Sequence, residues 1–145
     1  MSSLIIQNAF QAFASYDPGR ISAVLTEDAE WLSPPGNAVA VASGTTHHMI
    51  GREAITRFFA ESFPRLFARE VDVTFHGIHG DSERGLAEAT LTATLADGSP
   101  YNNDYCFVLE FRNGLVHRVR EYADTARGHR MLFGESPRQP LAGPR

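Results

Sequence analysis

Residues 105–124 read YCFVLEFRNGLVHRVREYAD and carry the clearest structural signal in the chain. From Tyr105 to Phe111, every second residue carries a large apolar side chain. A second alternating run occupies residues 115–123, and Asn113-Gly114 separates the two runs. A period of two is typical of a strand with one buried face, and Asn-Gly between two such runs is the strongest short-range signal of a hairpin. The stretch therefore predicts a pair of antiparallel strands.

Further alternating runs precede this hairpin, at residues 71–76 and 87–95. Turn signals follow each of them, Gly80-Asp81 after the first run and Asp97-Gly98 after the second. We therefore expect an antiparallel meander over the second half of the chain.

The first half of the chain shows helical periodicity instead. Apolar side chains three and four residues apart predict helices over residues 3–16, 20–26 and 51–66, the last kinked or ended by Pro64. A short strand is expected over residues 29–33, and a long loop or short strand over residues 38–46. Helices followed by a meander predict an α+β fold, with the helices on one face of a mainly antiparallel sheet.

The composition is that of an ordinary globular domain and excludes several classes of protein. The 145 residues carry a net charge of −4, and the 13 basic residues, all Arg, form no run, which argues against nucleic-acid binding. No apolar stretch is long enough to span a bilayer, and no secretory signal is visible. Cys106 is the single cysteine, so neither an intramolecular disulfide nor a multi-cysteine zinc site is possible.

From these observations we expect a cytoplasmic protein that binds neither nucleic acid nor membrane and uses no metal or other cofactor. One domain is expected over residues 1–125. Gly and Pro recur within residues 126–145, which predicts a loosely ordered C-terminal tail. Residues 131–133 of this tail can dock on the domain.

Glu121 is the residue that most invites a functional interpretation. Its parity in the last strand is shared by Leu115, His117, Val119 and Ala123. The apolar members of this set indicate that this parity faces the interior. Burial raises the pKa of a carboxyl group and suits it to proton transfer near neutral pH. The alternative is a structural ion pair with Arg118 or Arg120, or exposure at the sheet edge.

Other polar residues are further candidates for a site. Asp124 lies just past the last strand and is either a site residue or the cap of the following turn. His48, next to His47, is expected to line a pocket, and no nearby spacing predicts a metal site. Asn103 and Tyr105 can reach the pocket mouth, or they only begin their strand.

Motifs along the chain carry a family resemblance. They are Asp17 at the end of the first helix and residues 26–31 (TEDAEW), 51–55 (GREAI), 105–114 and 120–124 (REYAD). Over about residues 5–125, the chain resembles the nuclear transport factor 2-like superfamily. Within it the chain looks most like the SnoaL-like branch, which includes polyketide cyclases and phenazine-biosynthesis A/B-type proteins.

The resemblance implies a cone-shaped roll. In such a fold, three N-terminal helices pack in the concave face of a strongly curved, mainly antiparallel sheet around a deep apolar pocket. It also implies a homodimer.

Site residues of two branches of the superfamily are only partly matched. Where ketosteroid isomerases have their base and oxyanion donors, this chain has Ser33, Ala9 and Phe107, which argues against steroid isomerase chemistry. Limonene-type epoxide hydrolases have an acid where Asp124 stands, but Glu88 and Thr90 occupy the positions of its partners.

Two other branches match better. The catalytic Glu of phenazine-type proteins corresponds to Glu121, although Phe58 replaces its helper His and Ser62 fits a nearby polar position. SnoaL-like cyclases use an acid at the position of Asp124.

Together these features predict a cofactor-independent enzyme that isomerises, cyclises or dehydrates a small apolar or aromatic carbonyl metabolite. Glu121 moves the proton, and Asp124, His48 or Asn103 holds the partner oxygen. The expected pocket walls are Trp31, Phe59, Phe63, Tyr105, Phe107 and Val119. The alternatives are a non-catalytic small-ligand-binding or dimerisation module of the same fold, and an epoxide hydrolase that uses Asp124.

Overall fold

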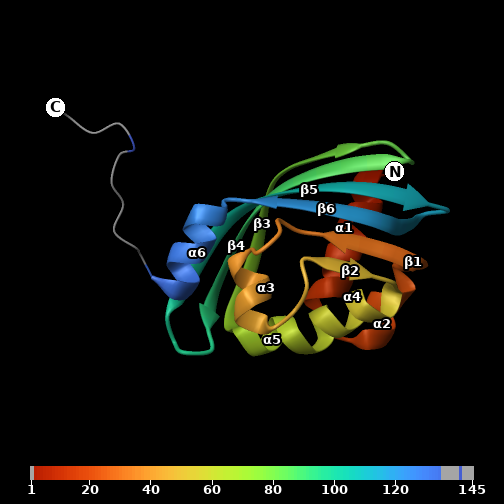
Figure 1. The fold of residues 1–145 in the computed structure, drawn as a ribbon. Coiled ribbons are helices and arrows are strands. Elements are labelled where there is room, and N and C mark those ends of the chain that lie inside the picture. The colour runs from red at the N-terminus through yellow and green to blue at the C-terminus, as the bar shows by residue number, and fades with distance from the viewer. Residues whose placement is uncertain (1, 135–140, 142–145) are drawn as a thin grey trace.

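Helices cover one side of a six-stranded sheet in the computed structural model, which describes residues 2–134 and 141 (Figure 1). The helices are α1 (Ser2–Ala14), α2 (Pro18–Ala23), α3 (Ala38–Ser43), α4 (Arg52–Arg57), the π-helical η1 (Phe58–Ser62), α5 (Phe63–Leu66) and α6 (Thr125–Phe133). The strands are β1 (Leu25–Leu32), β2 (His48–Ile50), β3 (Phe67–Gly80), β4 (Arg84–Leu95), β5 (Pro100–Arg112) and β6 (Leu115–Ala123).

The sheet has the strand order β2-β1-β6-β5-β4-β3. Strands β3 to β6 form the predicted antiparallel meander, and β1 lies parallel to β6. The predicted α+β class with a mainly antiparallel sheet is therefore confirmed. Among the described residues, no helix is both long and apolar enough to cross a bilayer.

Strand β6 does not alternate regularly along its whole length. Glu110 pairs with Arg118, but the next residue of β5, Phe111, pairs with Val116, so β6 carries one extra residue at this point. This β-bulge reverses the parity of the strand. Val116 is fully buried where simple alternation predicted that Leu115 and His117 face inward. Beyond the bulge, the predicted inward parity of Glu121 is correct, because Glu121 pairs with the buried Phe107.

The core lies between the helices and the concave face of the sheet. From α1, the side chains of Ile6, Ala9 and Phe13 are buried at helical spacing. They pack in one cluster with Trp31 of β1 and Phe107 of β5. The apolar stripe recognised in the sequence therefore anchors the first helix to the sheet.

Helix α3 occupies a segment for which the sequence predicted a loop or short strand. The Asn37 side chain accepts a hydrogen bond from the Ala40 N–H, and Gly44 ends the helix in the left-handed conformation at a φ of 67°. An Asn N-cap and a Gly after the last turn are standard helix boundaries. The prediction was wrong for residues 38–43 because it weighed the weak apolar pattern and ignored these caps.

The helix predicted over residues 51–66 forms, but it contains one wide π-turn. The Phe63 N–H bonds to the Phe58 carbonyl, five residues back, directly before Pro64. The ring of a proline conflicts with the carbonyl four residues earlier and removes a donor. The wider turn accommodates Pro64 without breaking the helix, which then ends at Leu66.

Helix α6 lies where the sequence predicted a loosely ordered tail. The Asp124 side chain caps it by accepting a hydrogen bond from the Arg127 N–H, and Gly128 is buried. Met131 and Leu132 pack on a second apolar cluster that includes Tyr101. Residues 135–140 and 142–145 of the expected tail lie outside the described part of the chain.

Gly85 of β4 tests the packing of α1 on the sheet. A Cβ at this position would lie 2.6 Å from Cδ1 of the fully buried Ile6 and 3.3 Å from the Phe111 ring. Overpacking of this kind costs roughly 1–3 kcal/mol. We expect Gly85→Ala to lower the free energy of unfolding by that amount in urea denaturation. The control is Gly19→Ala in α2, where a Cβ meets only ordinary contacts. Equal stability of the two variants would contradict the described packing.

Candidate functional site

A cavity of about 100 Å³ lies between the helices and the sheet. Its wall is mostly aromatic and comes from α1, the η1 turn and the sheet. The lining residues are Phe10, Phe13, Ala14, Tyr16, Trp31, Val39, Phe58, Phe59, Phe63, Phe67, Val71, Val73, Ala89, Leu91, Tyr105, Phe107 and Glu121. Glu121 is the single acidic side chain among them, so it determines what chemistry the cavity can support.

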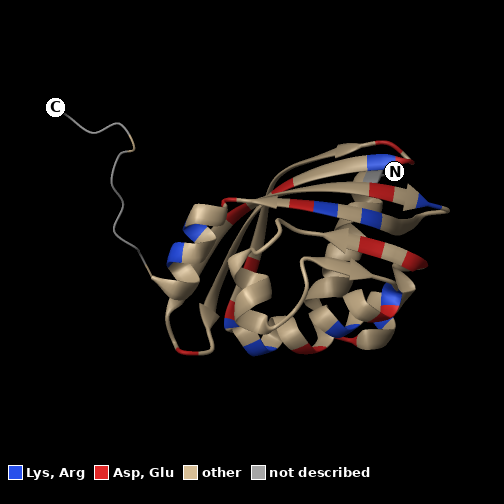
Figure 2. Cartoon of the chain, in the orientation of Figure 1, with Lys and Arg blue, Asp and Glu red and all other residues tan. Residues whose placement is uncertain are grey.

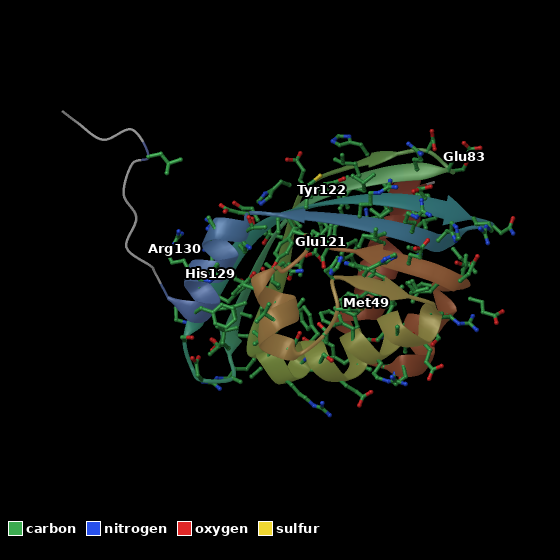
Figure 3. All side chains as sticks on the ribbon, in the orientation of Figure 1. Met49, Glu83, Glu121, Tyr122, His129 and Arg130 are labelled. Atoms are coloured by element: carbon green, nitrogen blue, oxygen red, sulfur yellow. The ribbon has the colours of Figure 1, made fainter. Side chains whose placement is uncertain are left out.

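The Glu121 carboxylate is held at one oxygen and open at the other. The Trp31 indole N–H donates to Glu121 Oε1 at 3.0 Å. Among the described residues, no side chain or backbone group forms a hydrogen bond with Oε2. In Figure 3, Glu121 lies on the side of β6 that faces the helices and Tyr122 on the other side. Oε2 is therefore the atom available to give or accept a proton.

Aromatic packing fixes the donor of this hydrogen bond. The Trp31 ring meets Phe13 and Phe59 edge to face, at centroid distances of 5.6 and 5.1 Å. Phe13 and Phe59 themselves are stacked 4.7 Å apart. Edge-to-face and stacked pairs have preferred geometries, so the indole N–H has little freedom to turn away from Glu121.

Burial raises the pKa of Glu121 to about 7, against an ordinary value of 4.5. Removal from water disfavours the charged carboxylate, and the hydrogen bond from Trp31 opposes this effect only in part. The part of Glu121 that stays accessible faces the cavity. A carboxyl group in this state exchanges its proton near neutral pH.

A pair of tyrosines lies beside Glu121. The hydroxyls of Tyr101 and Tyr105 are hydrogen-bonded at 2.6 Å, and the Asn103 side-chain amide donates to Tyr101 Oη at 3.2 Å. Burial raises the pKa of both tyrosine hydroxyls, and the nearby Glu121 carboxylate acts in the same direction. Both hydroxyls therefore keep their protons and act as hydrogen-bond donors.

The structure brings most of the predicted wall residues together. Trp31, Phe59, Phe63, Tyr105 and Phe107 all line the cavity with Glu121. Val119 is instead fully buried in the core and is not part of the lining. Asn103, only 2% exposed, donates to the Asp124 carbonyl oxygen and to Tyr101, so it supports the tyrosine pair from behind.

His48 lies away from the cavity. Its Nε2 is 2.8 Å from Glu30 Oε1, and the other oxygen of Glu30 accepts from Arg118 at 3.1 Å. These bonds lower the pKa of Glu30, with the His48 bond contributing most. Arg118 also approaches Glu110, so the network crosses β2, β1, β6 and β5 among the charged residues of these strands (Figure 2). His48 therefore belongs to a surface ion network, apart from the lining of the cavity.

Asp124 serves as a helix cap in this structure. It is exposed, and its Oδ1 accepts from the Arg127 N–H at 3.0 Å. It is absent from the lining of the large cavity. This corresponds to the capping alternative raised by its position after the strand.

Sequence reasoning missed several residues that shape the site. Tyr101 was not singled out because it begins its strand, and Val39 was not because its segment was not recognised as helical. Phe10 and Phe13 belong to the helical stripe of the first helix, so their place at the cavity could have been predicted from the sequence.

The described residues contain no cluster of three His, Cys, Asp or Glu side chains that could hold a metal ion.

The family pattern described as a SnoaL-like domain matches residues 6–119. The chain belongs to the SnoaL-like domain family. A search of curated proteins finds no match.

Solved structures share the fold of this SnoaL-like chain at low sequence identity. An NTF2-like protein of unknown function from Burkholderia pseudomallei is 21% identical, with a TM-score of 0.76, over 92% of this chain and 99% of that chain. TerC, co-crystallised with polyporic acid, is 20% identical, with a TM-score of 0.73, over 88% and 95%. An LEH-like epoxide hydrolase from M. tuberculosis is 18% identical, with a TM-score of 0.67, over 88% and 86%. The nuclear transport factor 2-like fold implied by the motifs is thereby confirmed.

The capping role of Asp124 can be separated from any need for its charge. We expect Asp124→Ala to lower the free energy of unfolding by about 1 kcal/mol, because the cap is lost. Asp124→Asn keeps an acceptor for the Arg127 N–H and is expected to stay within about 0.5 kcal/mol of the parent chain. Urea denaturation measures both variants. Equal losses in the two would show that the charge, and not the cap, stabilises this end of β6.

The raised pKa of Glu121 predicts a pH-dependent stability. The folded chain binds this proton more tightly (pKa about 7) than the unfolded chain (4.5). The stabilisation is therefore complete below the lower pKa and is lost as pH rises through the higher one. Relative to Glu121→Gln, we expect the free energy of unfolding to fall on the order of 3 kcal/mol between these limits. Denaturant titrations across this pH range measure it, and a difference independent of pH would contradict the assignment.

Proposed function

We propose that this protein is a cofactor-independent acid–base enzyme that moves a proton on a small apolar or aromatic carbonyl compound. Isomerisation, intramolecular cyclisation and dehydration all begin with such a proton transfer. One observation carries the proposal: a carboxyl group with a pKa of about 7 opens into an apolar cavity and has one oxygen free.

Glu121 in its carboxylate form is the general base. A proton beside a carbonyl group is removed most effectively by a base whose pKa lies near the working pH. The proton passes from the substrate carbon to Glu121 Oε2. The ketone becomes an enolate, with the negative charge largely on its oxygen. The proton then returns from Glu121 to another atom of the substrate, which leaves the enzyme unchanged.

The negative oxygen formed in this step needs a hydrogen-bond donor. The Tyr105 hydroxyl is the most suitable donor, because Tyr105 lines the cavity and its hydroxyl keeps its proton. A preorganised donor in a site without water stabilises developing charge more than it would in solution. Tyr105 therefore takes the oxygen-holding role that the sequence analysis gave to Asp124, His48 or Asn103.

The cavity also limits the size of the substrate. An apolar protein cavity of about 150 Å³ accommodates benzene, and the cavity here measures about 100 Å³. Because this volume is below that benchmark, the enclosed part of a substrate is limited to no more than about one ring. Small-molecule chemistry is also in keeping with the fold, since TerC was co-crystallised with polyporic acid and another neighbour is an epoxide hydrolase.

Two alternatives have different signatures. A binding module would use the same aromatic cavity but would bind its ligand without any proton exchange. An epoxide hydrolase that uses Asp124 is less favoured by the geometry, because that carboxylate caps α6 and lies outside the large cavity.

The homodimer implied by the resemblance stays a prediction. Tyr122 on the outer sheet face is 56% exposed, and its exposure can be used to detect an interface there.

The proposal is tested by proton exchange on a panel of cyclic and aryl ketones in D₂O, followed by NMR. We expect the chain to accelerate exchange beside the carbonyl group, with a rate that rises with pH and has its midpoint near 7. Glu121→Gln should lower the rate at least about 100-fold, since a positioned base contributes about that much.

The matched control is Glu88→Gln, the same change at an exposed position of β4, and it should leave the rate unchanged. Full exchange activity in Glu121→Gln would contradict the role of Glu121. Ketones that bind to the parent chain without any exchange would favour the binding module.

A further inference from the structure

A second, polar pocket adjoins the large cavity at Glu121. Its volume is about 20 Å³, and it lies between α3, α6 and the ends of β5 and β6. Val39, Tyr105 and Glu121 line both spaces. Its other polar lining residues are Asn37, Tyr101, Asn103, Asp124 and Thr125. The two spaces therefore meet at the carboxyl group, one apolar and one polar.

The tyrosine pair leaves one proton without an acceptor. Two hydroxyl protons are available, and one of them forms the 2.6 Å bond between Tyr101 and Tyr105. The Asn103 amide donates to Tyr101 Oη, and either tyrosine can be the donor in the bond between the two hydroxyls. Whichever of them donates, the other hydroxyl keeps a proton without an acceptor, and both tyrosines line the polar pocket. A buried hydroxyl proton without an acceptor is unfavourable, so an acceptor in the pocket is expected.

The amide of Asn103 is held in one orientation by three hydrogen bonds. Its Oδ1 accepts from the Asp104 N–H at 2.9 Å, and its Nδ2 donates to the Asp124 carbonyl at 3.1 Å and to Tyr101. Turning the amide over would place its oxygen against another oxygen at Asp124. Asn103 is therefore a fixed donor to Tyr101.

The same pocket offers an acceptor on its opposite side. Glu121 Oε2 has no protein partner among the described residues, and Glu121 lines both pockets. A group that fits between the tyrosine pair and Glu121 can accept from the pair and donate to Glu121. A carbonyl oxygen cannot donate to a carboxylate, whereas a hydroxyl group can do both.

We propose that the polar pocket is a subsite for one hydroxyl oxygen, held between the Tyr101–Tyr105 pair and Glu121. A site of about 10–15 Å³ suffices for one oxygen the size of water, and this pocket has about 20 Å³. The preferred ligand is then a single-ring compound with a hydroxyl group, with its ring in the apolar cavity. The inference rests on the proposed function, because the enol form of a ketone substrate carries such a hydroxyl group; water is the other source of the same chemistry.

The test compares phenol with toluene, which match in size but differ in the hydroxyl group. Dissociation constants are measured by NMR titration of the full chain. We expect the ratio of the toluene to the phenol constant to fall about tenfold in the double variant Tyr101→Phe, Tyr105→Phe, which is the effect of losing one hydrogen bond. Tyr122→Phe, on the exposed outer face, should leave the ratio unchanged.

Should the double variant fail to fold, the single Tyr105→Phe variant is used, with an expected fall of about threefold. An unchanged ratio in the folded variant overturns the inference. The inference is also overturned if neither phenol nor toluene binds the parent chain. A crystal structure with phenol separates the two sources of the oxygen. The phenol oxygen between Tyr105 and Glu121 supports the substrate hydroxyl, whereas phenol elsewhere with a water molecule in the pocket overturns the substrate class.

These outcomes are distinct from those of the proposed function. Ketone exchange that depends on Glu121, together with an unchanged phenol-to-toluene ratio, would leave the enzyme proposal standing and reject the subsite. A ratio that depends on the tyrosines, without any ketone exchange, would support the subsite and reject the enzyme proposal.

Discussion

The main physical constraint on the site is a carboxyl group held inside an aromatic cavity. Apolar surroundings disfavour the charge on Glu121, and the single hydrogen bond from Trp31 offsets this only in part. The outcome is a carboxyl group that is neither firmly charged nor firmly neutral near pH 7. Above its pKa the charged group lowers the stability of the fold. Packing of the aromatic rings around Trp31 therefore keeps Glu121 in its buried position.

Departures from regular structure surround this group and serve to place it. The β-bulge before Arg118 lets β6 bury Val116 at one end and still present Glu121 to the cavity at the other. The π-turn before Pro64 lets Phe58, Phe59 and Phe63 all contribute to the cavity wall. Bulges and π-turns re-aim side chains without ending their elements, and here both act on the same cavity.

Helices α3 and α6 give the site its polar side. They contact each other next to the ends of β5 and β6, as Figure 1 shows, and the small pocket lies among them. Gly128 of α6 lets the helix approach closely, since a Cβ there would lie 3.1 Å from the Asn103 amide nitrogen. The carboxyl group thus stands between an apolar space suited to a ring and a polar space suited to one oxygen. This division of the site gives the proposed chemistry its orientation.

Short-range patterns in the sequence predicted much of the local structure, although not α3 or α6, and the face on which Glu121 lies. The hairpin at Asn113-Gly114, the helical stripe of α1 and the inward parity beyond the bulge follow from short-range rules, because a period of two or of 3.6 assigns each side chain to a face. Such rules do not predict how close side chains from separate helices and strands come to one another. Only the tertiary structure brought Trp31 to Glu121, paired Tyr101 with Tyr105, took His48 into an ion network and made Asp124 a cap. Those outcomes depend on which side chains of neighbouring strands and helices come within hydrogen-bond reach, and strand register, bulges and helix packing decide that together.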